Sequence, residues 1–128
     1  MANNKSDYLE NAIADHVLGG NALTQPANYI ALSTTTINED GTGLLEPTGG
    51  YARQAVTFGA ASGGQKANSG DVLFGPASGS WGTITDFAIY DAASNGNQLY
   101  QGPLQSGVPV ADGETARFST GALTVTET

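Results

Sequence analysis

The part of the sequence that follows Gly20 consists of short runs of apolar, β-branched and aromatic residues, separated by turns rich in glycine and asparagine. Runs of this length that recur about every 8–12 residues are typical of antiparallel β-sandwiches and jelly rolls rather than of βαβ units. Asn95-Gly96 and Asp112-Gly113 have the composition of tight hairpin turns. The candidate strands are Asn28–Thr35, Tyr51–Phe58, Asp71–Phe74, Trp81–Asp91, Gln98–Leu104, Glu114–Thr120 and Ala122–Thr126. We therefore predict a mainly β fold, an antiparallel β-sandwich or jelly roll of about seven to nine strands.

The strongest strand signal lies at Trp81–Asp91, where apolar residues occupy both alternating sets of positions. One set holds Trp81, Phe87 and Ile89, and the other holds Ile84, Ala88 and Tyr90. Because a strand that is apolar on both sides is buried on both sides, we expect this one in the middle of a sheet. The expected core consists of Ile30, Leu32, Val56, Phe58, Ile84, Phe87, Ile89, Leu99, Phe118, Leu123 and Val125.

One helix is predicted, over about residues 7–18. Ser6 or Asp7 can cap its N-terminus, and Asp7 with Glu10 approximates a capping box. The pair Gly19-Gly20 provides the stop. The fold is therefore expected to carry a single N-terminal α-helix.

The apolar stripe of this helix is the candidate interface. It consists of Tyr8, Leu9, Ile13 and Val17. A helix this short is not stable alone in water, so its stripe must dock on the rest of the chain or on a neighbour. We predict that it joins copies of the chain in a homo-oligomer such as a trimer. The chain then comprises an N-terminal helical segment, residues 1–20, and a β-sandwich domain, residues 21–128, as one structural unit.

The charge of the chain excludes several classes of partner. Its 128 residues include 12 acidic and 4 basic ones, a formal net charge of −8. Nucleic-acid binding needs clustered Lys and Arg, and an anionic lipid surface would repel this chain.

The absence of cysteine excludes disulfides, thiolate metal sites and cysteine nucleophiles. The start lacks the apolar core of a secretory signal, and no apolar run approaches the ~20 residues of a membrane span, so we expect no membrane insertion.

Two places could bind a metal ion. His16 lies in the last predicted helical turn, where it suits the helix dipole or simply packs, and no second His or Cys exists to complete a site. The turn Asn38-Glu39-Asp40-Gly41 offers the oxygen ligands that calcium prefers, but the glutamate that would complete an EF-hand loop is absent. A solvated acidic turn is the favoured interpretation. We predict no essential metal and no cofactor.

No arrangement of residues predicts an active site. The sequence lacks a Gly-x-Ser-x-Gly elbow, a P-loop and a dinucleotide fingerprint. Trp81, Tyr51, Tyr90 and Tyr100 could form a sugar-stacking platform, although aromatic residues at strand ends more often plug the core. Acid pairs could cleave glycosides, but any chain with this many acids supplies such pairs; here they are Asp86/Asp91, Glu39/Asp40 and Asp112/Glu114. We therefore predict that the protein is not an enzyme.

The most distinctive signal is Gly49-Gly50-Tyr51-Ala52-Arg53 followed by Trp81-Gly82-x-Ile84. The surrounding segments are Leu18-Gly19-Gly20, Asn28–Thr35, Glu46–Ser62, Trp81–Ala93, Gly96–Leu104 and Gly121–Thr126. Together they resemble a family of small virion proteins of tailed bacteriophages that are often labelled tail-fibre-like. The resemblance covers nearly the whole chain, and it implies a structural component without catalytic residues.

Two functions fit this resemblance. The main prediction is a capsid decoration or cement protein bound to the major capsid protein, because no heptad or fibrous repeat gives the chain a shaft. The alternative is a tail, neck or baseplate component, such as a short fibre or adhesin that contacts the host surface. A small hydrolase or lectin unrelated to phages is a third hypothesis. In either phage function the protein would be located in the virion, after assembly in the cytoplasm of the bacterial host.

Overall fold

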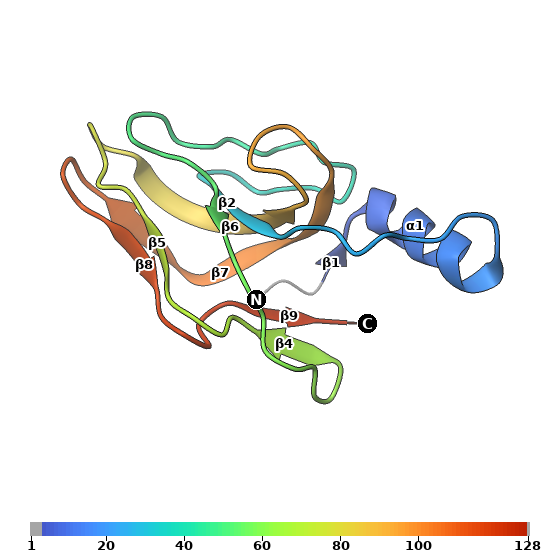
Figure 1. The fold of residues 1–128 in the computed structure, drawn as a ribbon. Helices are drawn as coiled ribbons and strands as arrows, with labels where there is room; N and C mark the ends of the chain where they lie inside the picture. The colour runs from blue at the N-terminus through green and yellow to red at the C-terminus, as the bar shows by residue number, and fades with distance from the viewer. Residues whose placement is uncertain (1–3, 128) are drawn as a thin grey trace.

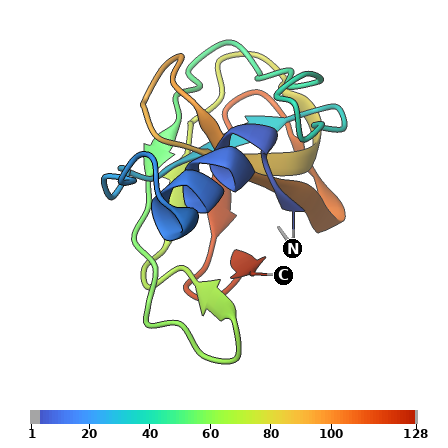
Figure 2. The same ribbon diagram turned by 90° about the vertical axis from the view of Figure 1, so that its right-hand side faces the viewer.

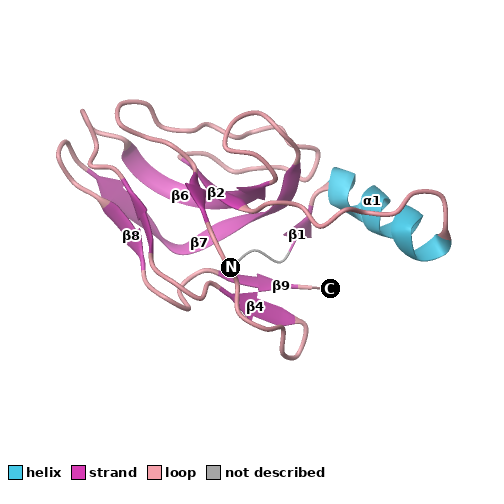
Figure 3. Cartoon of the chain, viewed as in Figure 1, coloured by secondary structure: helices cyan, strands magenta, loops and turns pink. Residues whose placement is uncertain are grey.

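The computed structural model describes residues 4–127, which fold into nine strands and one helix (Figures 1 and 3). The elements are β1 (Asn4–Lys5), α1 (Asp7–Leu18), β2 (Tyr29–Ser33), β3 (Gln54–Ala55), β4 (Gln65–Ala67), β5 (Val72–Phe74), β6 (Gly82–Tyr90), β7 (Gln98–Val110), β8 (Ala116–Phe118) and β9 (Thr124–Thr126). The predicted fold class, mainly β with one N-terminal helix, is confirmed.

All strand pairs are antiparallel, and they form two layers. A five-stranded sheet has the order β1-β7-β6-β2-β3, and the pairs β4-β9 and β5-β8 form separate two-stranded sheets. The two small pairs lie on one side of the large sheet (Figure 1). One apolar cluster joins residues of β2, β6 and β7 to residues of β5, β8 and β9, so the core lies between the layers. The jelly-roll form of the prediction stays a prediction.

The predicted core agrees with the buried residues at every position but one. All of the expected core residues except Phe58 are buried, and Phe58 is partly buried and packs against the same cluster. The largest fully buried side chains include Phe74 and Phe87. Phe74 contacts Phe118 edge to face, with ring centroids 6.0 Å apart, a favoured geometry for aromatic pairs. Alternating strand residues thus fill one continuous core.

Strand β6 lies in the middle of the large sheet, as its two apolar faces predict. Ala88 and Tyr90 point away from the main core into a second cluster with Ala31 and Ile37, which the 34–50 loop covers. The register shifts between Ile84 and Asp86, since these residues pair with Val108 and Pro103 of β7. Because of this irregularity, Ile84 faces the main core together with Phe87. The prediction that Ile84 lies on the same face as Ala88 and Tyr90 is therefore wrong.

Two short strands were not expected from the sequence. Strand β1 pairs with β7, and β4 pairs with β9. Both are polar and only two or three residues long, so neither shows the alternation that predicts a strand. In contrast, most of the expected strand at 51–58 is irregular, and only Gln54–Ala55 pairs with β2. Whether such a short segment forms a strand therefore depends on the strand beside it and not on its own residues.

The helix begins at the more N-terminal of the two expected caps. The Ser6 hydroxyl accepts a hydrogen bond from Leu9 N at 3.1 Å and donates one to the carbonyl of Gln98. Asp7 and Glu10 both lie in the first turn, where negative charge suits the helix dipole, so the predicted Asp7–Glu10 capping box is wrong. No helix among residues 4–127 is long and apolar enough to cross a membrane.

Candidate functional site

The predicted interface stripe divides between the core and the surface. Leu9 is buried at 4% exposure, and Ile13 packs against the main core. Tyr8 is 44% exposed, Val17 is 69% exposed and the neighbouring Leu18 is 84% exposed. Figures 1 and 2 show α1 at one end of the molecule, beyond β1. The helix is therefore anchored by its first half, and its last turn presents uncovered apolar side chains.

A groove of about 600 Å³ runs between α1 and the 21–27 segment that follows it. Tyr8 and Ala12 line it from the helix, and Leu23 and Pro26 line it from the following segment. His16 holds this segment in place, because its Nδ1 accepts a hydrogen bond from Leu23 N at 3.0 Å. His16 thus has a structural partner, in line with its predicted packing role. The exposed end of α1 and this groove are the two parts of the candidate interface.

The acidic turn is organised by hydrogen bonds within itself. The Asp40 carboxylate accepts from Thr42 N at 2.9 Å and from Thr42 Oγ1 at 2.6 Å. These hydrogen bonds hold the pKa of Asp40 below its usual range. Within residues 4–127 no group of three or more His, Asp or Glu side chains is placed to hold a metal ion. The Asp40 carboxylate of the turn thus has both of its hydrogen-bond donors on Thr42, within the same turn.

Chelation with EDTA is expected to leave the melting temperature of the protein unchanged within error. The reason is that Thr42 already satisfies Asp40, the central carboxylate of the turn. Differential scanning calorimetry with and without EDTA measures this. A drop of several degrees would revive the calcium site, since an ion that binds only the folded state stabilises it by mass action.

The four aromatic residues proposed as a sugar platform do not share one surface. Trp81 is 4% exposed and meets Tyr51 edge to face, with ring centroids 5.7 Å apart. Tyr90 belongs to the second apolar cluster, on the other face of the sheet. Tyr100 donates a hydrogen bond to Glu127 at 2.6 Å. Core packing is therefore confirmed for Trp81 and Tyr90, and a single platform built from all four is wrong.

Trp81 is fixed by the glycine pair of the distinctive motif. Its Nε1 donates to Gly49 O at 2.8 Å, and Ser78 N donates to the same oxygen at 3.0 Å. A Cβ at Gly49 would lie 2.2 Å from Ser78 O, and one at Gly50 would lie 2.6 Å from Pro76 O. Both glycines also have positive φ, 92° and 74°. Backbone packing at this point excludes any side chain.

Three of the carboxylates considered as acid pairs, Asp91, Asp112 and Glu114, hold loop backbone in place. Asp86 lies on β6 and accepts a hydrogen bond from Thr85 Oγ1 at 2.8 Å. Asp91 Oδ1 accepts from Asn97 N at 2.7 Å, which closes the loop between β6 and β7. In that loop Asn95 and Gly96 both have positive φ, 55° and 75°, as their sequence predicts. The loop spans residues 91–97, however, so the predicted tight hairpin between β6 and β7 is wrong. Asp112 accepts from Gly79 N at 2.9 Å, and Glu114 accepts from Ala111 N at 2.8 Å.

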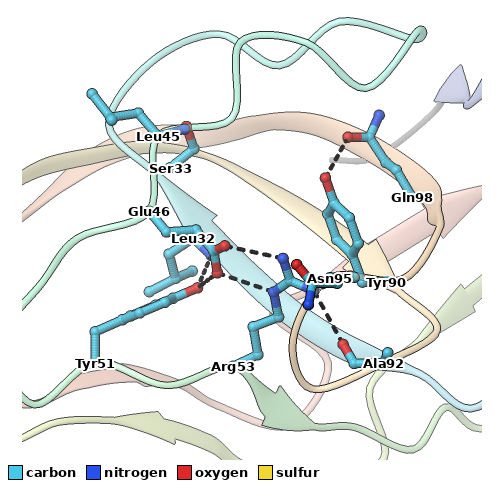
Figure 4. Close-up of polar contacts among 10 residues, drawn as sticks. All are labelled: Leu32, Ser33, Leu45, Glu46, Tyr51, Arg53, Tyr90, Ala92, Asn95 and Gln98. Atoms are coloured by element: carbon cyan, nitrogen blue, oxygen red, sulfur yellow. Dashed lines mark hydrogen bonds and ion pairs between the residues drawn. The ribbon is translucent and has the colours of Figure 1, made fainter.

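Sequence reasoning missed the ion pair between Arg53 and Glu46 (Figure 4). Arg53 Nε and Nη2 donate to the two Glu46 oxygens, each at 3.0 Å, which makes the pair bidentate. Arg53 Nη1 donates to the carbonyls of Ala92 and Asn95 at 3.1 and 2.8 Å. The guanidinium lies 4.0 Å from the centre of the Tyr90 ring. One side chain thus joins the 34–50 loop to the β6–β7 turn.

Tyr51 extends this network into the core. Its hydroxyl donates to Glu46 Oε2 at 2.5 Å and accepts from Leu32 N at 3.0 Å. Burial, and then the hydrogen bond to Glu46, raise the pKa of Tyr51 well above its usual range. Burial acts to lower the pKa of Arg53, but the hydrogen bond and charge of Glu46 outweigh it and the pKa rises. Tyr51 therefore stays protonated and Arg53 charged.

A second cavity, of about 590 Å³, lies between the large sheet and the β4–β9 pair. Its apolar lining includes Val56, Phe58, Ile89 and Val125, and its polar lining includes Gln25, Asn28, Lys66, Tyr100 and Glu127. Gln25, Lys66 and Glu127 are exposed, so solvent reaches the cavity from their side. Sequence reasoning missed this cavity because its walls come from distant segments.

A family model matches most of the chain. The family model described as podophage GP4 fiber I protein gp80 matches residues 4–126. No curated protein matches the chain. The matched region includes the helix, every strand and the glycine and arginine motif described above. The chain therefore belongs to the family of the podophage GP4 fiber I protein gp80, a family of phage virion structural proteins.

Proposed function

We propose that the protein is a non-enzymatic building block of a phage fibre, located at the tail, neck or baseplate of the virion, where it contacts the host surface. The observation that carries this proposal is the fibre-family match over residues 4–126. The same match favours the tail alternative over the capsid decoration protein that was the main prediction from sequence. A compact β domain without a shaft is compatible with a terminal or connecting module of a longer fibre.

The partners of the side chains that could do chemistry support a structural role. His16 receives a hydrogen bond from a backbone amide, and Asp91 and Glu114 each accept one from their own loop. Asp112 accepts one from Gly79 N in a separate loop. Glu46 is engaged by both Arg53 and Tyr51. A general acid or base needs hydrogen-bond reach to the proton that it transfers, and each of these groups makes a hydrogen bond that holds backbone or another side chain in place.

The uncovered end of α1 supports self-association. Val17 and Leu18 are adjacent and highly exposed. The groove beside the helix has a mixed lining, apolar at residues such as Leu23 and Pro26 and polar at residues such as Asn11 and Asp15. Burying a Val or Leu side chain contributes about 1.5–3 kcal/mol. The net charge of −8 opposes association by a term that salt screens. The proposed partners are therefore other copies of this chain, followed by other virion proteins.

The double substitution Val17→Ser/Leu18→Ser is expected to weaken self-association by about tenfold or more, because each tenfold change corresponds to about 1.4 kcal/mol. Its unfolding transition should be unchanged, since neither side chain belongs to the core. Analytical ultracentrifugation over a range of concentrations measures the effect. Leu73→Ser is the matched control, because Leu73 is 52% exposed on β5. An equal effect of both variants would place the interface elsewhere.

The location is tested on purified particles of the phage that encodes the chain. Quantitative mass spectrometry gives its copy number relative to the major capsid protein, and antibody labelling in electron microscopy gives its position. A handful to a few dozen copies, with label at the tail, neck or baseplate, is expected. Hundreds of copies over the head would overturn the fibre proposal in favour of decoration.

A further inference from the structure

We infer that the cavity between the large sheet and the β4–β9 pair binds a saccharide that carries a carboxylate, such as a uronic-acid oligosaccharide. The inference goes beyond the proposed function, because it concerns a ligand of the chain and not the place of the chain in the virion. The volume of about 590 Å³ lies within the ~300–1,000 Å³ range of small-molecule sites. A saccharide is chosen because the lining combines an apolar floor with free amides and one cation.

The floor of the cavity is apolar and rigid. Ile89 is 2% exposed and lies on the central strand β6, while Val56 and Val125 are each 8% exposed. The partly buried ring of Phe58 packs against the core beside them. A sugar ring presents a face of C–H groups that gains free energy when it leaves water for such a surface. The remaining hydroxyls then need polar partners.

Those partners stand at the rim without any other engagement. The side-chain amides of Gln25 and Asn28 line the cavity and make no hydrogen bond within the described chain. Elsewhere, by contrast, amides such as Asn68 and Gln98 are engaged by carbonyls. A carboxamide supplies donors and an acceptor side by side, which matches a pair of neighbouring hydroxyls. Two uncommitted amides over an apolar floor therefore suit a sugar.

The acidic group is inferred from Lys66. Of the four basic residues, it alone has no ion pair within residues 4–127, as the others form the pairs Lys5–Glu127, Arg53–Glu46 and Arg117–Asp71. Glu127 also lines the cavity, but its carboxylate is engaged by Lys5 and by the Tyr100 hydroxyl. The free charge of the cavity is therefore the Lys66 ammonium, within a chain of net charge −8. A carboxylate on the ligand complements it.

Isothermal titration calorimetry on the full chain tests the ligand class with trigalacturonic acid and its neutral methyl ester. The acid is expected to bind about fivefold more tightly than the ester, the effect of one solvent-accessible ion pair. Lys66→Gln should remove this difference. Arg117→Gln, which removes an exposed cation outside the cavity, should leave it intact. Equal affinities of wild type for the two ligands, or the same response from both variants, would overturn the inference, as would no binding of either ligand.

The position of the site is tested by a second pair of variants. Gln25→Ala is expected to weaken both ligands about two- to fivefold, because it removes hydrogen bonds to hydroxyls that both carry. Gln105→Ala is the matched control, an exposed glutamine on β7 that does not line the cavity. Melting temperatures of all variants should match the wild type, since every altered side chain is exposed. Equal weakening by both glutamine variants would place the binding elsewhere.

Discussion

Replacement of Gly49 by alanine is expected to lower the free energy of unfolding by about 2–5 kcal/mol, because it adds backbone strain to overpacking. The added Cβ would lie 2.2 Å from the carbonyl oxygen of Ser78, where φ is already +92°. Neither backbone can move away without loss of the two hydrogen bonds that Gly49 O accepts, from Ser78 N and Trp81 Nε1. Urea unfolding, followed by the fluorescence of the single tryptophan, measures the loss.

Gly79→Ala separates the two contributions to this loss. Gly79 has almost the same φ, +87°, but no atom lies within 4 Å of its Cβ position. The free energy of unfolding of this variant should therefore fall only by the cost of a left-handed backbone, about 1–2 kcal/mol. If Gly49→Ala costs no more than Gly79→Ala, the close approach of the two loops does not explain why the motif contains glycine.

The large strands could be predicted because their own residues determine them. In β6 the alternation of Phe87 and Ile89 with Ala88 and Tyr90 indicates two buried faces, and the structure has both. The turn at Asn95-Gly96 is equally local, since few other residue pairs tolerate two successive positive φ angles. For β6 and for the Asn95-Gly96 turn, the residues of the segment itself are therefore sufficient, whereas the strand expected at 51–58 is mostly irregular.

The short strands and the network around Arg53 could not be predicted, because each depends on a distant partner. Strand β4 is polar, and it is a strand only because it pairs with β9, with Lys66 opposite Val125. Arg53 and Glu46 are seven residues apart across an irregular loop, a spacing that no helix or strand rule connects. Only the resemblance drew attention to Arg53, and it gave no partner. The cavity escaped prediction for the same reason.

The helix shows a different limit. Periodicity places Leu9, Ile13 and Val17 on one stripe, but it cannot say where the covering surface ends. The β domain covers Leu9 and Ile13, and Val17 extends past it. Contact between the whole stripe and other copies of the chain stays a prediction. The exposed last turn of the helix is the part that we propose for this contact. An apolar stripe that packs on the β domain of its own chain and one that packs on another copy of the chain look the same in the sequence.

Arg53→Met is expected to lower the free energy of unfolding by about 2–4 kcal/mol, near the cost of leaving one member of a buried ion pair without its partner. The Arg53 side chain is 7% exposed and that of Glu46 is 25% exposed, so the remaining carboxylate is only partly hydrated. The substitution also removes the donors to Ala92 O and Asn95 O and the contact with Tyr90. Urea unfolding gives the magnitude.

Arg117→Met is the matched control for this prediction. Its side chain is 60% exposed and pairs with Asp71, which is 39% exposed, and exposed pairs contribute little to stability. The double variant Glu46→Gln/Arg53→Met should recover part of the loss of Arg53→Met, because it leaves no charge unpaired. If it recovers nothing, Arg53 stabilises the fold through the two loop carbonyls and Tyr90 rather than through Glu46. If Arg53→Met costs no more than Arg117→Met, the network does not hold the loops together.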